Sequence, residues 1–234
     1  MAQVTYQQRR QQIEHYFNRT AADVWARLTS DEPVSGIRET VRSGREEMRN
    51  TLLSWLPEDL SGRQVLDAGC GTGVISIELA RRGAEVIAID LSQSLIELAN
   101  ERYSTMDEYH RIQFFVGDMG QLEGERFDHV LAMDSIIHYS AKDGLRILEK
   151  LADSVDESMI FTFAPKTVPL AMMHAFGKLF PKADRAPAIE PVPPKSLTRS
   201  IAKSEAMKDW QVDRECRISS SFYTSQAMEL VRIC

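Results

Sequence analysis

Four aspartates are candidates for a binding site because each stands at or near the end of a short apolar segment. They are Asp67, Asp90, Asp118 and Asp134. Ionised carboxylates accept hydrogen bonds from hydroxyl and amino groups and attract cations. In an open parallel sheet the carboxyl ends of the strands form one edge, and ligands bind there. We therefore expect the four side chains to lie close together. The alternative for any one of them is helix capping or solvation in a loop.

A glycine-rich turn follows the first apolar segment in the sequence VLDAGCGTG, residues 65–73. Its glycines, Gly69, Gly71 and Gly73, have the spacing G-x-G-x-G and not the G-x-G-x-x-G of dinucleotide sites. Residues without side chains let a ligand approach the backbone closely, so we expect Gly69 and Gly71 to contact the methionine part of a cofactor. With Asp67 on the strand before it, this turn predicts binding of S-adenosylmethionine.

Each remaining part of that cofactor has a candidate partner in the sequence. Asp67 is placed to bind the ammonium group, directly or through water. Asp90 follows the second apolar segment, where a carboxylate accepts both ribose hydroxyls, and Leu91 is placed to pack on the adenine. Asp118 is placed to accept the adenine amino group, with Met119 against the ring. We also assign Asp134 to this cofactor site.

Short apolar segments alternate with amphipathic ones from residue 63 onward. The predicted strands are 64–68, 84–90, 112–118, 127–134 and 158–164, and the predicted helices are 74–82, 95–103 and 142–155. Ser92 is well placed to cap the second of these helices. Strands of this kind, separated by helices, are typical of a parallel sheet that is covered on both faces. We further expect a strand over 210–223 and a short final helix over 225–233.

Two amphipathic helices, over 5–30 and 37–56, precede the first strand. We divide the chain into an N-terminal helical cap, residues 1–57, and a cofactor-binding domain, residues 58–234. A segment at about 165–205, rich in Pro, Met and basic residues, interrupts the alternation. The predicted fold is therefore Rossmann-like α/β, with a seven-stranded, mostly parallel sheet, an N-terminal helical cap and a helical insertion after the fifth strand.

The composition narrows the class of protein. The chain has 234 residues, a net charge of −6 and three cysteines. An acidic balance argues against wrapping nucleic acid, which needs clustered Lys and Arg. The cysteines have neither a disulfide framework nor zinc-ligand spacing, so we expect no metal site. No stretch is long and apolar enough to span a membrane. We expect a cytoplasmic protein, with peripheral membrane contact left open.

Several segments along nearly the whole chain resemble the magnesium-protoporphyrin IX O-methyltransferase family of (bacterio)chlorophyll biosynthesis. They are HYFNRTAADVWARL, VRSGREEM, DAGCGTGVISIELA, LAMDSIIHY, TFAPKT, FGKLFP and SFYTS. The resemblance implies methyl transfer from S-adenosylmethionine to one propionate of Mg-protoporphyrin IX, which gives the monomethyl ester. Two places depart from the family's pattern. Leu28 and Thr29 stand where an aromatic residue is frequent, and Arg45 stands where relatives commonly carry histidine.

The implied reaction places chemical demands on the acceptor site. A propionate is ionised at neutral pH, so it needs no general base. His138 lies just past the fourth strand, and we expect it to orient the reacting carboxylate. Axial ligation of the substrate's magnesium and a structural role are the alternatives for His138. Tyr16 is a second catalytic candidate, which either closes over the cofactor or belongs to the core.

The insertion supplies candidates for binding the macrocycle. Lys166 is placed to anchor the propionate that does not react. Met172 and Phe176 lie in a short apolar helix and are candidates for the flat wall that a porphyrin needs. The alternative for this helix is packing in the core.

The sequence is also compatible with two other functions. The first is an O-methyltransferase of another small molecule, such as a quinone-like phenol, with His138 as a general base. The second is a porphyrin carrier with little turnover, although a carrier has no need of a methyl donor. The partners we expect are the Mg-porphyrin substrate and, by contact, a Mg-chelatase or a cyclase.

Overall fold

The computed structural model describes residues 5–21, 29, 36–122, 124–166, 188–220 and 222–233. Seven strands form one sheet in the order β3-β2-β1-β4-β5-β7-β6. Their bounds are β1 Gln64–Ala68, β2 Glu85–Asp90, β3 Ile112–Val116, β4 Phe127–Ala132, β5 Val155–Phe163, β6 Trp210–Ser219 and β7 Thr224–Arg232. The first five strands are parallel, and β7 lies antiparallel between β5 and β6.

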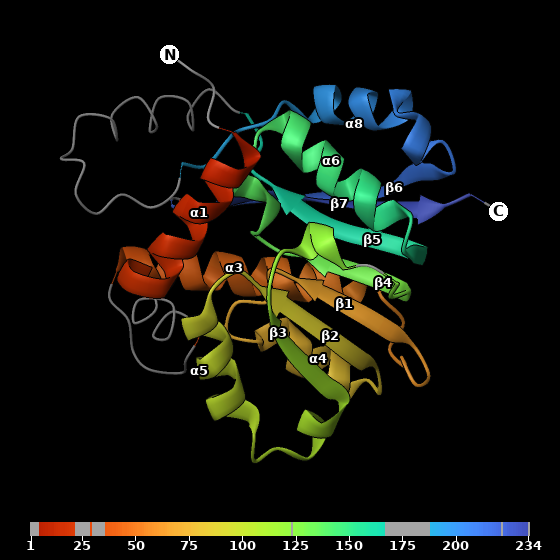
Figure 1. Cartoon of the computed structure of the whole chain (residues 1–234). Helices are drawn as coiled ribbons and strands as arrows, with labels where there is room; N and C mark the ends of the chain where they lie inside the picture. The colour runs from red at the N-terminus through yellow and green to blue at the C-terminus, as the bar shows by residue number, and fades with distance from the viewer. Residues whose placement is uncertain are drawn as a thin grey trace.

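Helices cover both faces of this sheet (Figure 1). The helices α3 (Ile37–Ser54), α4 (Val74–Arg81) and α5 (Gln93–Tyr103) pack on one face. On the other face lie α6 (Ala141–Ala152) and α8 (Pro194–Lys203). Across the ends of the strands runs α1 (Tyr6–Tyr16), which continues as a π-helical turn, Phe17–Ala21. In the described part of the chain, no helix has the length and apolar character that crossing a membrane requires.

The predicted architecture is confirmed, including the seven-stranded, mostly parallel sheet and the N-terminal helices. The Ser92 cap is also confirmed, because its Oγ accepts a hydrogen bond from the Leu95 N–H at 3.3 Å. The final helix predicted over 225–233 is wrong, since this segment forms β7. Its Gln, Met, Glu and Leu residues favour a helix, but pairing with β5 and β6 buries it on both faces. The candidates Met172 and Phe176 lie outside the described residues.

A close contact fixes the position of α3 against the sheet. The helix buries Met48 and Leu52 completely. At Gly44 the absence of a side chain admits the ring of Tyr223, because a Cβ there would lie 2.6 Å from Tyr223 Cδ1. Tyr223 directly precedes β7, so the N-terminal half of α3 packs against the edge of the sheet where β7 begins.

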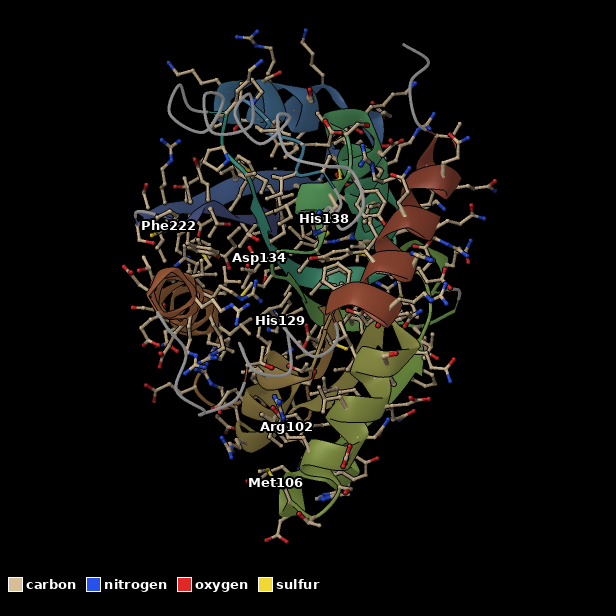
Figure 2. All side chains as sticks on the ribbon, turned by 90° about the vertical axis from the view of Figure 1, so that its left-hand side faces the viewer. Arg102, Met106, His129, Asp134, His138 and Phe222 are labelled. Atoms are coloured by element: carbon tan, nitrogen blue, oxygen red, sulfur yellow. The ribbon has the colours of Figure 1, made fainter. Side chains whose placement is uncertain are left out.

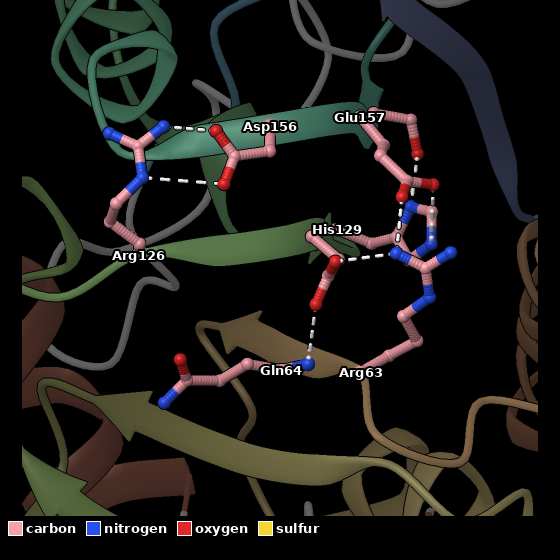
Figure 3. Close-up of polar contacts among 8 residues, drawn as sticks. Arg63, Gln64, Arg126, His129, Asp156 and Glu157 are labelled. Carbon is pink, nitrogen blue, oxygen red and sulfur yellow. Dashed lines mark hydrogen bonds and ion pairs between the residues drawn. The ribbon is translucent and has the colours of Figure 1, made fainter.

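Polar contacts join three strands at the opposite end of the sheet (Figure 3). The Arg63 guanidinium, just before β1, donates to Asp128 of β4 at 2.7 Å and also to Glu157 of β5. His129 of β4 is buried, and its Nδ1 lies 2.9 Å from Ser158 Oγ. Burial lowers the pKa of His129, which favours the neutral imidazole. These contacts join the amino ends of β1, β4 and β5, at the opposite end of the strands from Asp67, Asp90 and Asp134.

Candidate active site

A cavity of about 220 Å³ opens at the carboxyl ends of the strands. The strand order reverses between β1 and β4, and such a switch point is where ligands bind in open α/β sheets. The glycine turn, the ends of β2 and β4, and residues of α1 and α3 line the cavity. In Figure 2, Asp134 and His138 lie between α3 and α1.

The glycine turn passes close to the segment that follows β4. Gly69 has a φ of 82°, in the left-handed region that side chains rarely adopt. A Cβ on Gly69 would lie 2.3 Å from the Cβ of Ser135. The Gly69 N–H donates to Ile89 O at 2.8 Å, which holds the turn against β2. Only glycine fits here, so this part of the turn presents bare backbone to the cavity.

The carboxyl group of Asp67 is buried beside this turn, with 1% of the residue exposed. Ser76 Oγ donates to Asp67 Oδ2 at 2.7 Å. Burial raises the pKa of Asp67 to about 7, and the nearby charge of Asp90 adds to the rise. A cationic ligand in the cavity would offset the cost of burying this carboxylate and favour its ionised form.

Asp90 is oriented by backbone groups at the end of β2. It accepts hydrogen bonds from the N–H groups of Gly71 at 2.9 Å and Ser92 at 2.8 Å. Burial raises its pKa, while these hydrogen bonds oppose the rise. Leu91 and Met119 also line the cavity. The structure thus brings seven of the eight residues assigned to the cofactor from sequence to the cavity. Six of them are Asp67, Gly69, Gly71, Asp90, Leu91 and Met119, and the seventh is Asp134.

Asp118 differs from these seven because its carboxylate binds α1 and does not line the cavity. The Tyr6 hydroxyl lies 2.8 Å and 2.9 Å from the two carboxylate oxygens, and the Gly120 N–H donates to Oδ1 at 2.9 Å. Arg10 forms an ion pair with Asp118 at 3.6 Å. The Tyr6 ring stacks on Tyr139 at a centroid distance of 5.3 Å. In this structure Asp118 therefore fastens α1 over the site.

Asp134 lines the cavity but binds groups of the chain itself. It has a φ of 52°, the one positive value outside glycine among the described residues. The Arg45 guanidinium of α3 donates to Oδ2 at 2.5 Å. Three hydroxyl groups also donate to this carboxylate, at 3.2 to 3.3 Å. They belong to Thr162 of β5, Ser225 of β7 and Tyr223, which precedes β7.

The three predicted acceptor-side residues occupy different places. His138 is 8% exposed and lines the cavity, with its ring edge-on to Phe17 at 6.0 Å. Tyr16 is half-buried against Phe17 and does not line the cavity. Lys166 is exposed, outside the cavity lining, and its N–H donates to Val192 O at 3.0 Å. Of the three, the structure brings only His138 into the cavity.

The sequence prediction missed an arginine face on α3. The cavity is lined by Arg42, Arg45 and Arg49. Residues three and four positions apart share one side of a helix, and the buried Met48 and Leu52 mark the side that packs on the sheet. The spacing of the arginines in the sequence indicates that they share one side of the helix. The sequence does not indicate that this side faces the cavity, because that depends on how α3 packs against the sheet.

The glycine turn at the switch point, with an acidic residue at the end of β2, defines a class I S-adenosylmethionine-dependent methyltransferase. Residues 65–157 match the family model described as a methyltransferase domain. The residues present fit the cofactor, because the turn offers a cradle that a Cβ would fill and Asp67 offers a buried carboxylate to its cationic part.

More specific comparisons extend over nearly the whole chain. Residues 132–232 match the family model for the C-terminus of magnesium-protoporphyrin IX methyltransferase. A magnesium-protoporphyrin O-methyltransferase of Rhodobacter capsulatus is 44% identical over 96% of this chain and 97% of its own length. One from Synechocystis is 31% identical over 94% and 95%. This chain belongs to the magnesium-protoporphyrin O-methyltransferase family.

A solved structure agrees with this assignment. The crystal structure of magnesium protoporphyrin IX methyltransferase from Synechocystis with bound SAH, S-adenosylhomocysteine, matches with a TM-score of 0.82 and 30% identity. The match covers 94% of this chain and 98% of that one.

The raised pKa of Asp67 predicts that donor affinity depends on pH. Below about pH 7 the folded protein holds a proton on Asp67, and binding of the ammonium group, which S-adenosylmethionine and S-adenosylhomocysteine share, must displace it. The affinity for the donor should therefore rise with pH by at most about tenfold per pH unit, and it should become constant above about pH 7. Calorimetric titration with S-adenosylhomocysteine from about pH 5.5 to 8.5 measures this.

The control is Asp67→Asn, which has no proton to lose. This variant should bind S-adenosylhomocysteine more weakly than the wild type at high pH. Its affinity should also lack the rise with pH that deprotonation of Asp67 causes. An unchanged pH profile in Asp67→Asn would show that Asp67 does not control donor binding.

Proposed function

We propose that this chain transfers the methyl group of S-adenosylmethionine to a propionate carboxylate of Mg-protoporphyrin IX. The product is the monomethyl ester, an intermediate of (bacterio)chlorophyll biosynthesis. The observation that carries the proposal is the 44% identity to the Rhodobacter capsulatus enzyme, which extends over both chains almost completely. A single cavity lined by Asp67, Asp90 and His138 supports it.

We assign the donor to the half of the cavity formed by β1, β2 and the loop after β3. Asp90 accepts the ribose hydroxyls, while Leu91 and Met119 pack on the adenine. Asp67 faces the cationic part of the donor, and Gly69 and Gly71 admit the methionine part. When bound, S-adenosylmethionine supplies an electrophilic methyl group on a positively charged sulfur.

The chain contributes position and a dry environment rather than a base. The acceptor carboxylate is ionised at neutral pH, and water stabilises the separated charges of carboxylate and sulfonium before they react. Excluding water and aligning the reactants therefore lower the barrier. We assign the orientation of the carboxylate to His138. The cover over the site is α1, which Asp118 holds through Tyr6. Tyr16 belongs to this cover. Lys166 is exposed outside the cavity lining, so we assign it no role in anchoring the propionate.

The test of this function is methyl transfer from labelled S-adenosylmethionine to Mg-protoporphyrin IX. We expect labelled monomethyl ester, and no label on the dimethyl ester of the same porphyrin, which has no free carboxylate. At saturating donor the rate should stay nearly flat down to about pH 6, because the propionate is already ionised. Label that appears only on a phenolic acceptor, or not at all, would contradict the proposal.

The role of His138 leads to a separate prediction. Replacing it with alanine should lower kcat by about 100-fold, because a misplaced acceptor loses its alignment. The affinity for S-adenosylhomocysteine should stay unchanged, and His138→Gln, which keeps a hydrogen-bond donor, should recover part of the rate. If His138 ligated the magnesium instead, its removal would shift the absorption spectrum of the bound porphyrin. Wild-type kcat in His138→Ala would reject both roles.

We also propose transient contacts with the enzymes on either side of this reaction, a Mg-chelatase or a cyclase, and peripheral contact with a membrane surface. The support is that the macrocycle is flat and apolar and that Phe222 is 49% exposed, next to Tyr223, whose hydroxyl donates to Asp134 of the cavity. Flotation with lipid vesicles tests the membrane contact, with Phe222→Ser as the matched variant. We expect flotation of the wild type and reduced flotation of the variant, and equal flotation of the two would reject a contact through Phe222.

A further inference from the structure

The arginine face of α3 gives the cavity a wall rich in guanidinium groups. Arg42, Arg45 and Arg49 all line the cavity, together with Glu46. Glu46 is largely exposed and lies 3.8 Å from Arg49. Guanidinium groups bind carboxylates with two parallel hydrogen bonds. A wall of this kind fits a ligand that brings its own carboxylate into the cavity.

The strand order divides the three arginines between two halves of the site. Arg45 binds Asp134, which follows β4 and also accepts bonds from β5 and from the start of β7. These strands lie on the other side of β1 from β2 and β3, which form the donor half. Arg42 lies one turn before Arg45 on the same helix. Both therefore belong to the half of the cavity that His138 shares.

Arg49 lies one turn further along α3, toward the donor half. Burial raises the pKa of Tyr103 in α5, and the charges of Arg102 and Arg49 partly oppose that rise. The Tyr103 ring lies 3.0 Å from the place where a Cβ of Gly73 would stand. Arg49 is thus closer to the glycine turn, and we do not include it in the proposed site.

The arginines are carried on a helix that is firmly docked. Tyr223 packs on Gly44, next to Arg45 in the sequence, and its hydroxyl donates to the carboxylate of Asp134. Asp134 in turn balances the charge of Arg45. A second guanidinium, that of Arg42, lines the same cavity one turn earlier on α3, so this corner of the cavity presents two guanidinium groups.

We propose that Arg42, with Arg45 beside it, binds the carboxylate of the acceptor that is not methylated. The proposal rests on the proposed function and specifies how its substrate is held. A cation paired with the reacting carboxylate would weaken it as a nucleophile, whereas the second carboxylate can be paired without that loss. The site would thus fix the orientation of a substrate with two carboxylates while leaving the reacting one to His138.

The test compares the binding of three forms of the Mg-porphyrin to Arg42→Gln. The diacid and the monomethyl ester still carry a carboxylate for this site, and the dimethyl ester does not. A charge-assisted hydrogen bond contributes enough that its loss should raise the Kd of the first two forms by about tenfold or more. The Kd of the dimethyl ester should not change. Arg42→Lys, which keeps the charge, should recover part of the affinity.

Arg38→Gln is the matched control, because Arg38 lies one turn earlier on α3, is exposed and does not line the cavity. It should bind all three forms as the wild type does. The thermal unfolding midpoints of the variants show that each is folded. S-adenosylhomocysteine is titrated in parallel, and its Kd should be unaffected by Arg42→Gln.

Three outcomes overturn the proposal. Equal weakening of all three porphyrin forms would mean that Arg42 only supports the apolar wall. Weaker binding of S-adenosylhomocysteine with unchanged porphyrin binding would assign Arg42 to the donor's carboxylate. Wild-type affinity for every ligand would remove Arg42 from the site. The proposed function fails separately, if wild-type protein forms no ester from Mg-protoporphyrin IX.

Discussion

The carboxylate of Asp134 joins parts of the chain that are far apart in sequence, and the corner of the cavity that Asp134 shares with Arg45 depends on it. It pairs with Arg45 of α3, 89 residues earlier, and accepts a bond from Ser225 of β7, 91 residues later. A buried carboxylate is costly unless charged and polar partners surround it, and here four side chains do so. Their convergence also explains why Asp134 tolerates a left-handed backbone, a conformation that costs a non-glycine residue about 1 kcal/mol or more.

This backbone conformation affects two parts of the cavity. It turns the chain so that Ser135 packs against Gly69 of the glycine turn and His138 reaches the cavity. The glycine turn and His138 are therefore held by the same short segment. Methyl transfer needs the two reactants in line, and a shared support is a direct way to keep their separation constant.

The sequence correctly predicted that the glycine turn and the end of β2 lie at the cavity, because the signals for these residues are local. The glycine turn, Asp67, Asp90 and Leu91 each lie beside the strand that positions them, so strand prediction placed them correctly at one edge. Asp118 and Asp134 also lie at that edge, but their partners are remote. Tyr6, which binds Asp118, is 112 residues away, and no local pattern indicates such a pairing. For the same reason no local pattern indicates that the arginines of α3 line the cavity. The missed strand β7 has a helix-favouring composition, and only its neighbours in the sheet decide its conformation.

The position of β7 in the sheet has a consequence for how the chain folds during its synthesis. Although β7 comes later in the chain than β6, it lies between β5 and β6 in the sheet. During synthesis β6 emerges first, yet it has no place in the sheet until β7 arrives to bridge it to β5. Until then the edge of β5 is exposed, which is a hazard for association with other chains. The growing chain can thus complete its glycine turn early, while the corner that holds Asp134 closes only after Ser225 has been added.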